Sequence, residues 1–88
     1  MLVLNNIDLE SSRIPSKPWE DGTLHVNTPV GWVYGVYLAC PYNRIEKTLI
    51  GMGYIYKIRY NGEDHFTKEV GETIKAYRVD ELLQGAIK

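Results

Sequence analysis

Short runs in which apolar and polar residues alternate, separated by turn-forming residues, dominate the chain from residue 23 onward. Alternation with a period of two places successive side chains on opposite faces of a strand. The clearest run covers residues 52–60, where one face carries Met52, Tyr54, Tyr56, Ile58 and Tyr60. The other face carries Gly53, Ile55, Lys57 and Arg59. This pattern predicts a β-strand with one strongly aromatic face.

The dipeptide Asn61-Gly62 follows this strand and is a strong β-hairpin signal. Residues 63–70 are therefore expected to form the returning strand. Two registers are open: a two-residue loop places His65 on the face of Ile58, whereas a longer loop with a glycine bulge places Phe66 there. We favour the bulged loop, because it buries a phenylalanine on the aromatic face rather than a histidine.

Residues 23–28 and 32–39 are interpreted as two further strands, separated by Pro29, which blocks continuation of the hydrogen-bond ladder. Both faces of the second run are apolar, as in a strand that is buried on two sides or curls around a small barrel. Gly35 is the expected position of a bend. The larger continuous face predicts a core made of Trp32, Tyr34, Val36 and Leu38. Tyr37, and Tyr42 beyond the strand, are then the rings expected to be available to a partner.

The first 22 residues differ from the rest of the chain. Pro15 and Pro18 favour extended backbone before them, and the segment ends at a turn signal, Asp21-Gly22. We expect an N-terminal arm over residues 1–22 and a β-domain over residues 23–88.

Residues 41–51 show no apolar stripe long enough to predict a helix, and they are interpreted as a connection. Residues 73–79 predict the last strand. After it, Asp80 is expected to cap a short C-terminal helical turn. Leu82 and Leu83 in this turn would seal an open end of the sheet.

Five short strands, close turns and no long helix predict a mainly β, single small domain: a five-stranded SH3-like barrel or a strongly bent antiparallel sheet. The segments NTPVGWVYGV, YIYKIRYNGEDHF and YRVDELL, within about residues 24–83, resemble SH3-like barrels of the Tudor or KOW type. The chain lacks the ALYDY-type start of signalling SH3 domains, so binding of proline-rich peptides is not implied. The resemblance implies a binding module that uses an open face or rim of aromatic residues.

Composition narrows the classes of function. The 88 residues carry 10 Lys and Arg against 11 Asp and Glu, a formal net charge of −1. A protein whose affinity comes from neutralising many phosphates needs an excess of Lys and Arg, so this charge argues against that class. No run approaches the roughly 18–20 apolar residues of a membrane span. The N-terminus also lacks the basic flank and the long apolar run of a signal peptide. We expect a cytoplasmic protein that does not enter a membrane.

No combination of residues predicts catalysis, a metal site or a cofactor site. Cys40, the only cysteine, forms no internal disulfide, and its neighbours do not lower a thiol pKa, so we interpret it as a packing residue. One Cys and two His, His25 and His65, match no zinc spacing. Glu63 and Asp64 adjoin His65, but neighbouring strand residues point to opposite faces. The glycine motifs of nucleotide and nucleophile sites are absent from the sequence.

Aromatic and basic residues supply the remaining signal. Residues 51–60, GMGYIYKIRY, partly resemble the RNP1 strand of RNA-recognition motifs, although no basic residue precedes Gly53 and Arg59 replaces the last aromatic. Tyr, Trp and Arg are also the types enriched at interface hot spots. We predict a non-enzymatic binding or regulatory module that acts through a protein–protein interface, with a protein partner or a second copy. The alternative is a weak nucleic-acid-binding β-barrel. The residues predicted to bind are Tyr37, Tyr42, Lys57, Arg59, Lys75 and Arg78.

Overall fold

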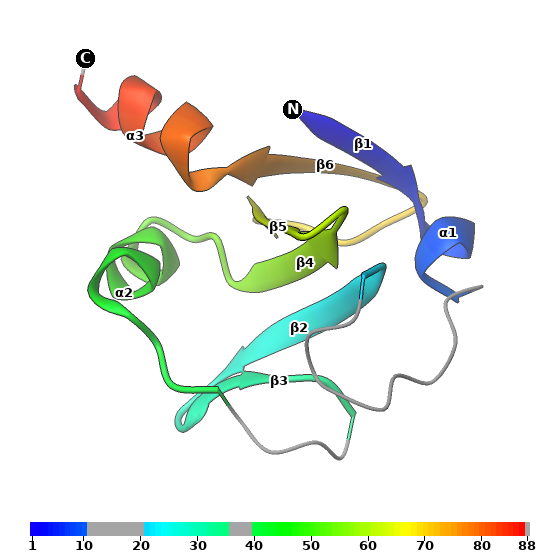
Figure 1. Ribbon diagram of the computed structural model, residues 1–88, viewed down its shortest axis with the longest axis horizontal. Helices are drawn as coiled ribbons and strands as arrows, with labels where there is room; N and C mark the ends of the chain where they lie inside the picture. The colour runs from blue at the N-terminus through cyan, green and yellow to red at the C-terminus, as the bar shows by residue number, and fades with distance from the viewer. Residues whose placement is uncertain (11–20, 36–39, 88) are drawn as a thin grey trace.

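Figure 1 shows a computed structural model of the chain, which describes residues 1–10, 21–35 and 40–87. The described residues form, in order, β1 (Leu2–Asn5), α1 (Asn6–Glu10), β2 (Thr23–Thr28), β3 (Gly31–Val33), α2 (Arg44–Gly51), β4 (Tyr56–Tyr60), β5 (Glu63–Thr67), β6 (Thr73–Arg78) and α3 (Val79–Ile87). The strands make one six-stranded sheet in the order β1-β6-β5-β4-β2-β3, in which every pair is antiparallel. No helix in the described part of the chain is long and apolar enough to cross a membrane.

Strand β6 joins two parts of the sheet, because its two ends pair with different strands. Residues 73–76 pair with β1, and Tyr77 and Arg78 pair with β5. In Figure 1, β1 and β6 lie together at the top of the molecule, while β2 and β3 form the opposite end. The prediction of a mainly β domain with a strongly bent antiparallel sheet and a short C-terminal helix is confirmed. The sheet is open rather than a closed barrel, since β1 and β3 are the outermost strands in its order.

Each face of the sheet carries its own hydrophobic core. On one face, the first core consists of Leu4, Ile58, Ile74 and Ala76, with Leu2, Leu9, Leu24 and Tyr60 packed against it. On the other face, the second core consists of Trp32, Leu49, Phe66 and Leu82, to which α2 and α3 each contribute a leucine. Trp32 is fully buried, as the sequence predicted. Strand β4 is therefore covered on both sides.

Helix α2 occupies residues that the sequence pattern did not predict to be helical. Its first turn is fixed by a capping box: the Asn43 side chain accepts the Glu46 backbone N–H at 2.8 Å, and the Glu46 carboxylate accepts the Asn43 N–H at 2.9 Å. This pair satisfies two of the backbone donors that a helix start leaves unpaired. The apolar face is short, with Leu49 buried and Ile45 exposed. The cap and the packing of Leu49 together explain a helix of only eight residues.

The β4–β5 hairpin has the two-residue loop, so the prediction of a bulged loop is wrong. Tyr60 pairs with Glu63, and Ile58 pairs with His65. Asn61 and Gly62 have φ values of 52° and 76°, the two positive values that a type I′ turn requires. Phe66 is nevertheless buried, because the helices cover the face opposite to Ile58.

Strand β3 is shorter than predicted and ends at Val33, before Gly35 with its φ of 58°. Backbone hydrogen bonds of 2.9 Å in both directions join Trp32 to Cys40. Gly31 has a φ of 131°, and a Cβ atom there would lie 2.2 Å from the Cys40 carbonyl oxygen, so only glycine fits. The predicted core residues Val36 and Leu38 lie outside the described residues, as do Pro15 and Pro18 of the predicted arm.

The C-terminal helix starts one residue earlier than expected, at Val79. The side chain that accepts the Arg78 backbone N–H is that of Glu81, at 2.8 Å, and Asp80 lies within the first turn. Leu82 is buried in the second core, whereas Leu83 is 37% exposed. The helix therefore covers the sheet through one of the two leucines predicted to do so.

Candidate binding pocket

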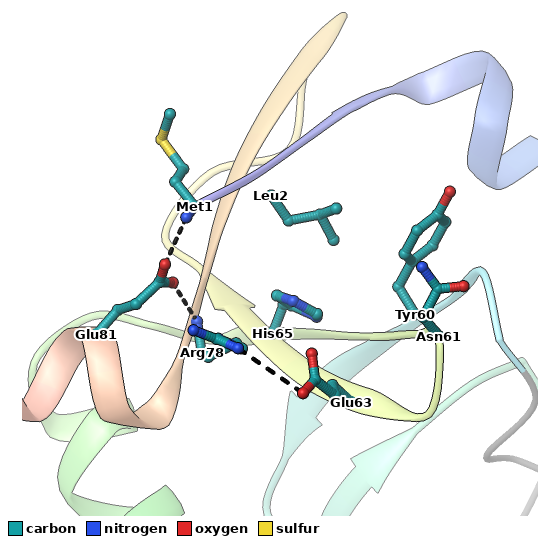
Figure 2. A pocket seen from close by; sticks show the side chains of 8 residues that line it. All are labelled: Met1, Leu2, Tyr60, Asn61, Glu63, His65, Arg78 and Glu81. Atoms are coloured by element: carbon teal, nitrogen blue, oxygen red, sulfur yellow. Dashed lines mark hydrogen bonds and ion pairs between the residues drawn. The ribbon is translucent and has the colours of Figure 1, made fainter.

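A pocket of about 260 Å³ opens where β1, the β4–β5 hairpin, the end of β6 and the start of α3 meet (Figure 2). We call it the His65 pocket. The residues that line it are Met1, Leu2, Tyr60, Asn61, Glu63, His65, Arg78 and Glu81. The sheet register brings these distant segments together: His65 pairs with Arg78, and Leu2 pairs with Ala76 two positions before Arg78.

His65 is the most deeply buried polar side chain of this pocket. It is 6% exposed, and its Nδ1 atom is buried without a hydrogen-bond partner among the described residues. Figure 2 shows the imidazole ring in the middle of the lining side chains, below Leu2. The large majority of buried side-chain polar atoms in folded proteins have a partner. A residue that lines the pocket therefore contains a buried nitrogen whose hydrogen-bonding capacity the described residues leave unused.

Three carboxylates and two cations, the Arg78 guanidinium and the Met1 amino group, lie in or beside the pocket. The Arg78 Nη1 atom lies 3.8 Å from Glu63 Oε1, and its Nε atom lies 3.4 Å from Asp80 Oδ1. Both ion pairs are largely exposed, and exposed pairs contribute only about 0–1 kcal/mol. Glu81 accepts hydrogen bonds from the amino group of Met1 and from the Arg78 backbone, and these lower the pKa of its carboxyl, the amino group most strongly. Of these three carboxylates, Glu63 therefore has the longest contact with its cation.

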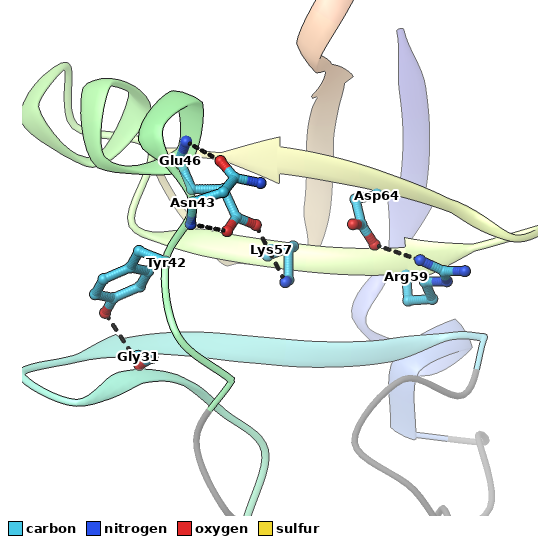
Figure 3. Close-up of polar contacts among 7 residues, drawn as sticks. All are labelled: Gly31, Tyr42, Asn43, Glu46, Lys57, Arg59 and Asp64. Atoms are coloured by element: carbon cyan, nitrogen blue, oxygen red, sulfur yellow. Dashed lines mark hydrogen bonds and ion pairs between the residues drawn. The ribbon is translucent and has the colours of Figure 1, made fainter.

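A second polar cluster lies between α2 and the sheet (Figure 3). The Lys57 Nζ atom is 3.3 Å from Glu46 Oε2, with both side chains buried, and 5.1 Å from the centroid of the Trp32 ring. Burial lowers the pKa of the Lys57 ammonium, and the Glu46 carboxylate acts in the opposite direction. Lys57, predicted as a surface cation for a partner, is instead a buried member of an ion pair, because α2 covers it and supplies the counter-ion.

Tyr42, predicted as an available ring, is half-buried beside the same helix. Its hydroxyl accepts the Thr28 backbone N–H at 2.8 Å and contacts the Asn27 side chain and the Gly31 carbonyl oxygen, the last drawn in Figure 3. Its ring meets the Trp32 ring edge-on, with 5.3 Å between centroids. These contacts tie the start of α2 to the β2–β3 turn.

The other residues predicted to bind a partner are spread over the molecule. Arg78 lines the His65 pocket, and Arg59 pairs with Asp64 across the hairpin at 3.1 Å. Lys75 lines a different pocket of about 420 Å³, called here the Lys75 pocket, whose residues are Tyr54, Thr67, Lys68, Glu69, Thr73, Lys75 and Tyr77. Tyr37 lies outside the described residues. The structure therefore does not bring the predicted set together in one site.

Sequence reasoning missed Tyr60, Glu63 and His65 as a group. The sequence pattern indicated His65 as a candidate metal ligand and as one of two residues that could share the face of Ile58, Glu63 as a candidate metal ligand, and Tyr60 as part of an aromatic face. The signal that finds them is the Asn61-Gly62 turn with its two-residue loop, since this register places Tyr60 opposite Glu63 and His65 on the same face.

Comparison of the chain with protein-family models, with curated proteins and with solved structures finds no match. Within residues 1–10, 21–35 and 40–87, no three His, Cys, Asp or Glu side chains are placed to hold a metal ion. The function therefore has to be argued from the pockets themselves.

Proposed function

We propose that the protein is a small, non-enzymatic binding or regulatory module that binds a protein partner, or a second copy of itself, at the His65 pocket. The observation that carries this proposal is the buried Nδ1 atom of His65, which has no partner among the described residues. A buried polar atom left without a hydrogen bond costs about 1–3 kcal/mol. A partner group that displaces the side chains over this atom and bonds to it would recover that penalty.

The size and the composition of the pocket support a protein ligand. Its volume of about 260 Å³ lies below the roughly 300–1,000 Å³ of small-molecule sites and suits one side chain of a partner. Tyr60 and Arg78 in its wall belong to the residue types that are enriched at interface hot spots. A volume of this size holds one side chain more readily than a whole small-molecule substrate, which supports binding over catalysis.

Site-specific photocrosslinking tests this proposal. A photoreactive amino acid is placed at Asn61, on the exposed rim of the pocket, and as a matched control at Thr48, which is also exposed and lies on α2. In cells that express the protein naturally, we expect Asn61 to give a defined crosslinked protein, or a crosslinked second copy, that Thr48 does not give. The proposal fails if the two positions give the same products or if Asn61 gives none.

A second candidate function, weak binding of single-stranded nucleic acid, is favoured by the Lys75 pocket. Two half-buried tyrosines, Tyr54 and Tyr77, lie in it beside Lys68 and Lys75. Lys68 Nζ lies 5.0 Å from the centroid of the Tyr54 ring. Aromatic rings that stack bases next to cations that follow phosphates are the components of single-strand binding.

Fluorescence anisotropy with a labelled oligothymidylate and oligouridylate distinguishes this second candidate from the first. We expect binding at low salt that weakens steeply as salt increases, and that the double substitution Lys68→Gln with Lys75→Gln abolishes. The matched control is Lys47→Gln, which removes an exposed cation from α2. If no anisotropy change occurs at low salt, or if Lys47→Gln weakens binding equally, this candidate fails.

A further inference from the structure

We propose that the His65 pocket receives a basic side chain, lysine or arginine, of the protein partner. The proposal rests on the proposed function and names the chemistry of the group that enters. Three features of the pocket point to a cation: the hydrogen-bonding character of the His65 Nδ1 atom, the excess of carboxylates, and an apolar and aromatic wall that fits a long aliphatic stem.

The unpartnered nitrogen of His65 is best suited to accept a hydrogen bond. A neutral imidazole has one N–H donor and one lone-pair acceptor. In the backbone of folded proteins, a buried N–H without an acceptor is rarer than a buried carbonyl without a donor, and we infer the same preference for the imidazole ring. We therefore assign the lone pair to Nδ1, because no described residue offers it a hydrogen-bond partner. A ligand that donates, such as an ammonium or guanidinium group, is the complement of this atom.

The charges around the pocket favour the same ligand. Glu63 and Glu81 line it, and Asp80 lies next to Arg78, so three carboxylates face two cations, the Arg78 guanidinium and the Met1 amino group that Glu81 binds. Glu63 is 56% exposed and meets Arg78 only at 3.8 Å, which is longer than a hydrogen bond. An entering cation can take the place of Arg78 at Glu63 while Arg78 keeps its contact with Asp80. The exchange costs little, because an exposed ion pair at this distance contributes little.

The remaining wall fits the stem of a basic side chain. Leu2 and Tyr60 both pack against the first hydrophobic core and both line the pocket. Figure 2 shows Tyr60 rising from the end of the hairpin on the side of the pocket opposite to Glu81. Lys and Arg side chains bury their methylene stems on apolar surface while the charged group seeks polar partners. An aromatic ring beside a cation adds a further favourable contact.

Nuclear magnetic resonance titration of the isotopically labelled full chain tests the proposal with defined probes. The probes are the N-acetyl, N′-methylamide forms of lysine, arginine, norleucine and glutamate. We expect the lysine or arginine probe to shift the amides of residues 60–65 and Arg78, and to bind about tenfold more tightly than norleucine, which has the stem without the charge. The proposal is overturned if norleucine binds equally well or if the glutamate probe binds most tightly.

Two further measurements test the roles of the His65 Nδ1 atom as an acceptor and of the Glu63 carboxylate. Long-range nitrogen–proton spectra of His65 report which ring nitrogen carries the proton, and a proton on Nδ1 in the free protein overturns the proposal without any substitution. Glu63→Gln is expected to weaken the basic probes about fivefold. The matched control Glu72→Gln removes an exposed carboxylate outside the pocket and is expected to leave affinity unchanged. Equal weakening by both variants overturns the proposal.

The failure of this proposal is distinguishable from the failure of the proposed function. If Asn61 crosslinks a partner but the basic probes do not bind, the pocket binds a protein through another chemistry. If the basic probes bind but Asn61 crosslinks no protein, the chemistry of the pocket is correct and the protein partner is not.

Discussion

The stability of the fold should fall as the pH is lowered through the titration range of His25. This residue is fully buried on β2, directly opposite Lys57 on β4. Burial, and after it the positive charge of Lys57, together lower the pKa of His25 from 6.5 to about 4, against smaller opposing effects from backbone hydrogen bonds and the charge of Asp64. The folded protein therefore keeps this imidazole neutral at pH values where the unfolded chain protonates it.

The sign and the size of the effect follow from these two pKa values. Between pH 6.5 and about 4 the unfolded chain binds a proton that the folded chain does not, so lowering the pH favours unfolding. The full interval corresponds to about 3 kcal/mol, at about 1.36 kcal/mol for each pH unit. Between about pH 7.5 and about pH 5, a range above the titration of most carboxylates, the protonation of His25 in the unfolded chain should reduce the free energy of unfolding by about 2 kcal/mol.

Urea unfolding at these two pH values, followed by circular dichroism, measures the loss. With a typical slope for a chain of this length, the midpoint is expected to move by roughly 1 M urea. The same pair of measurements on His25→Gln supplies the control, because the variant keeps the carboxylates but lacks the imidazole. The variant should lose about 2 kcal/mol less than the parent between the two pH values, whatever its own stability. Equal losses in the two proteins would refute the assignment of the effect to His25.

Three substitutions, one of them with a matched control, test the contacts that hold the second core together. Glu46→Gln leaves Lys57 buried without its carboxylate partner and should reduce the free energy of unfolding by about 3–5 kcal/mol in urea titrations, whereas a loss below 1 kcal/mol contradicts a buried ion pair. Gly31→Ala places a methyl group 2.2 Å from a backbone oxygen and should reduce the free energy of unfolding by more than about 3 kcal/mol. The control Gly51→Ala, at the open end of α2, should leave the free energy of unfolding unchanged or raise it by up to about 1 kcal/mol. Similar changes in the two variants would contradict the close contact at Gly31. Tyr42→Phe leaves a β2 backbone N–H without its acceptor and should lower the thermal midpoint through a loss of about 1–3 kcal/mol, and an unchanged midpoint would argue against that hydrogen bond.

The sequence pattern correctly predicted which residues share a face of a strand, but it did not predict which helices cover that face. The alternation over residues 52–60 places Ile58 and Lys57 on opposite faces, and the structure has them so. What failed is the assumption that the face of Lys57 is open to solvent. That assumption came from missing α2, whose apolar stripe is short but whose capping pair, Asn43 and Glu46, is visible in the sequence as an Asn followed three residues later by a Glu.

The same missed helix explains the wrong hairpin register. If one face of β5 were exposed, burying Phe66 would require it to share the face of Ile58, and only the bulged loop does this. With α2 and α3 on the other face, the two-residue loop buries Phe66 there and directs His65 toward the first core. The His65 pocket was beyond prediction for a further reason. Its residues come from both ends of the chain and from the β4–β5 hairpin, and the pairing of β1 with β6 brings Leu2 near Arg78.

The two-core arrangement also changes what the aromatic content of the chain implies. Seven tyrosines and two tryptophans exceed what one small core needs, which at first favours rings left over for a partner. A sheet with a core on each face uses several of these rings internally: Tyr60 packs on one core, and Tyr42, Tyr54 and Tyr77 pack on the other. The surplus of aromatic residues is therefore weak support for an external partner. The stronger support is polar: a buried His65 nitrogen with no described hydrogen-bond partner, beside a carboxylate that its ion pair holds loosely.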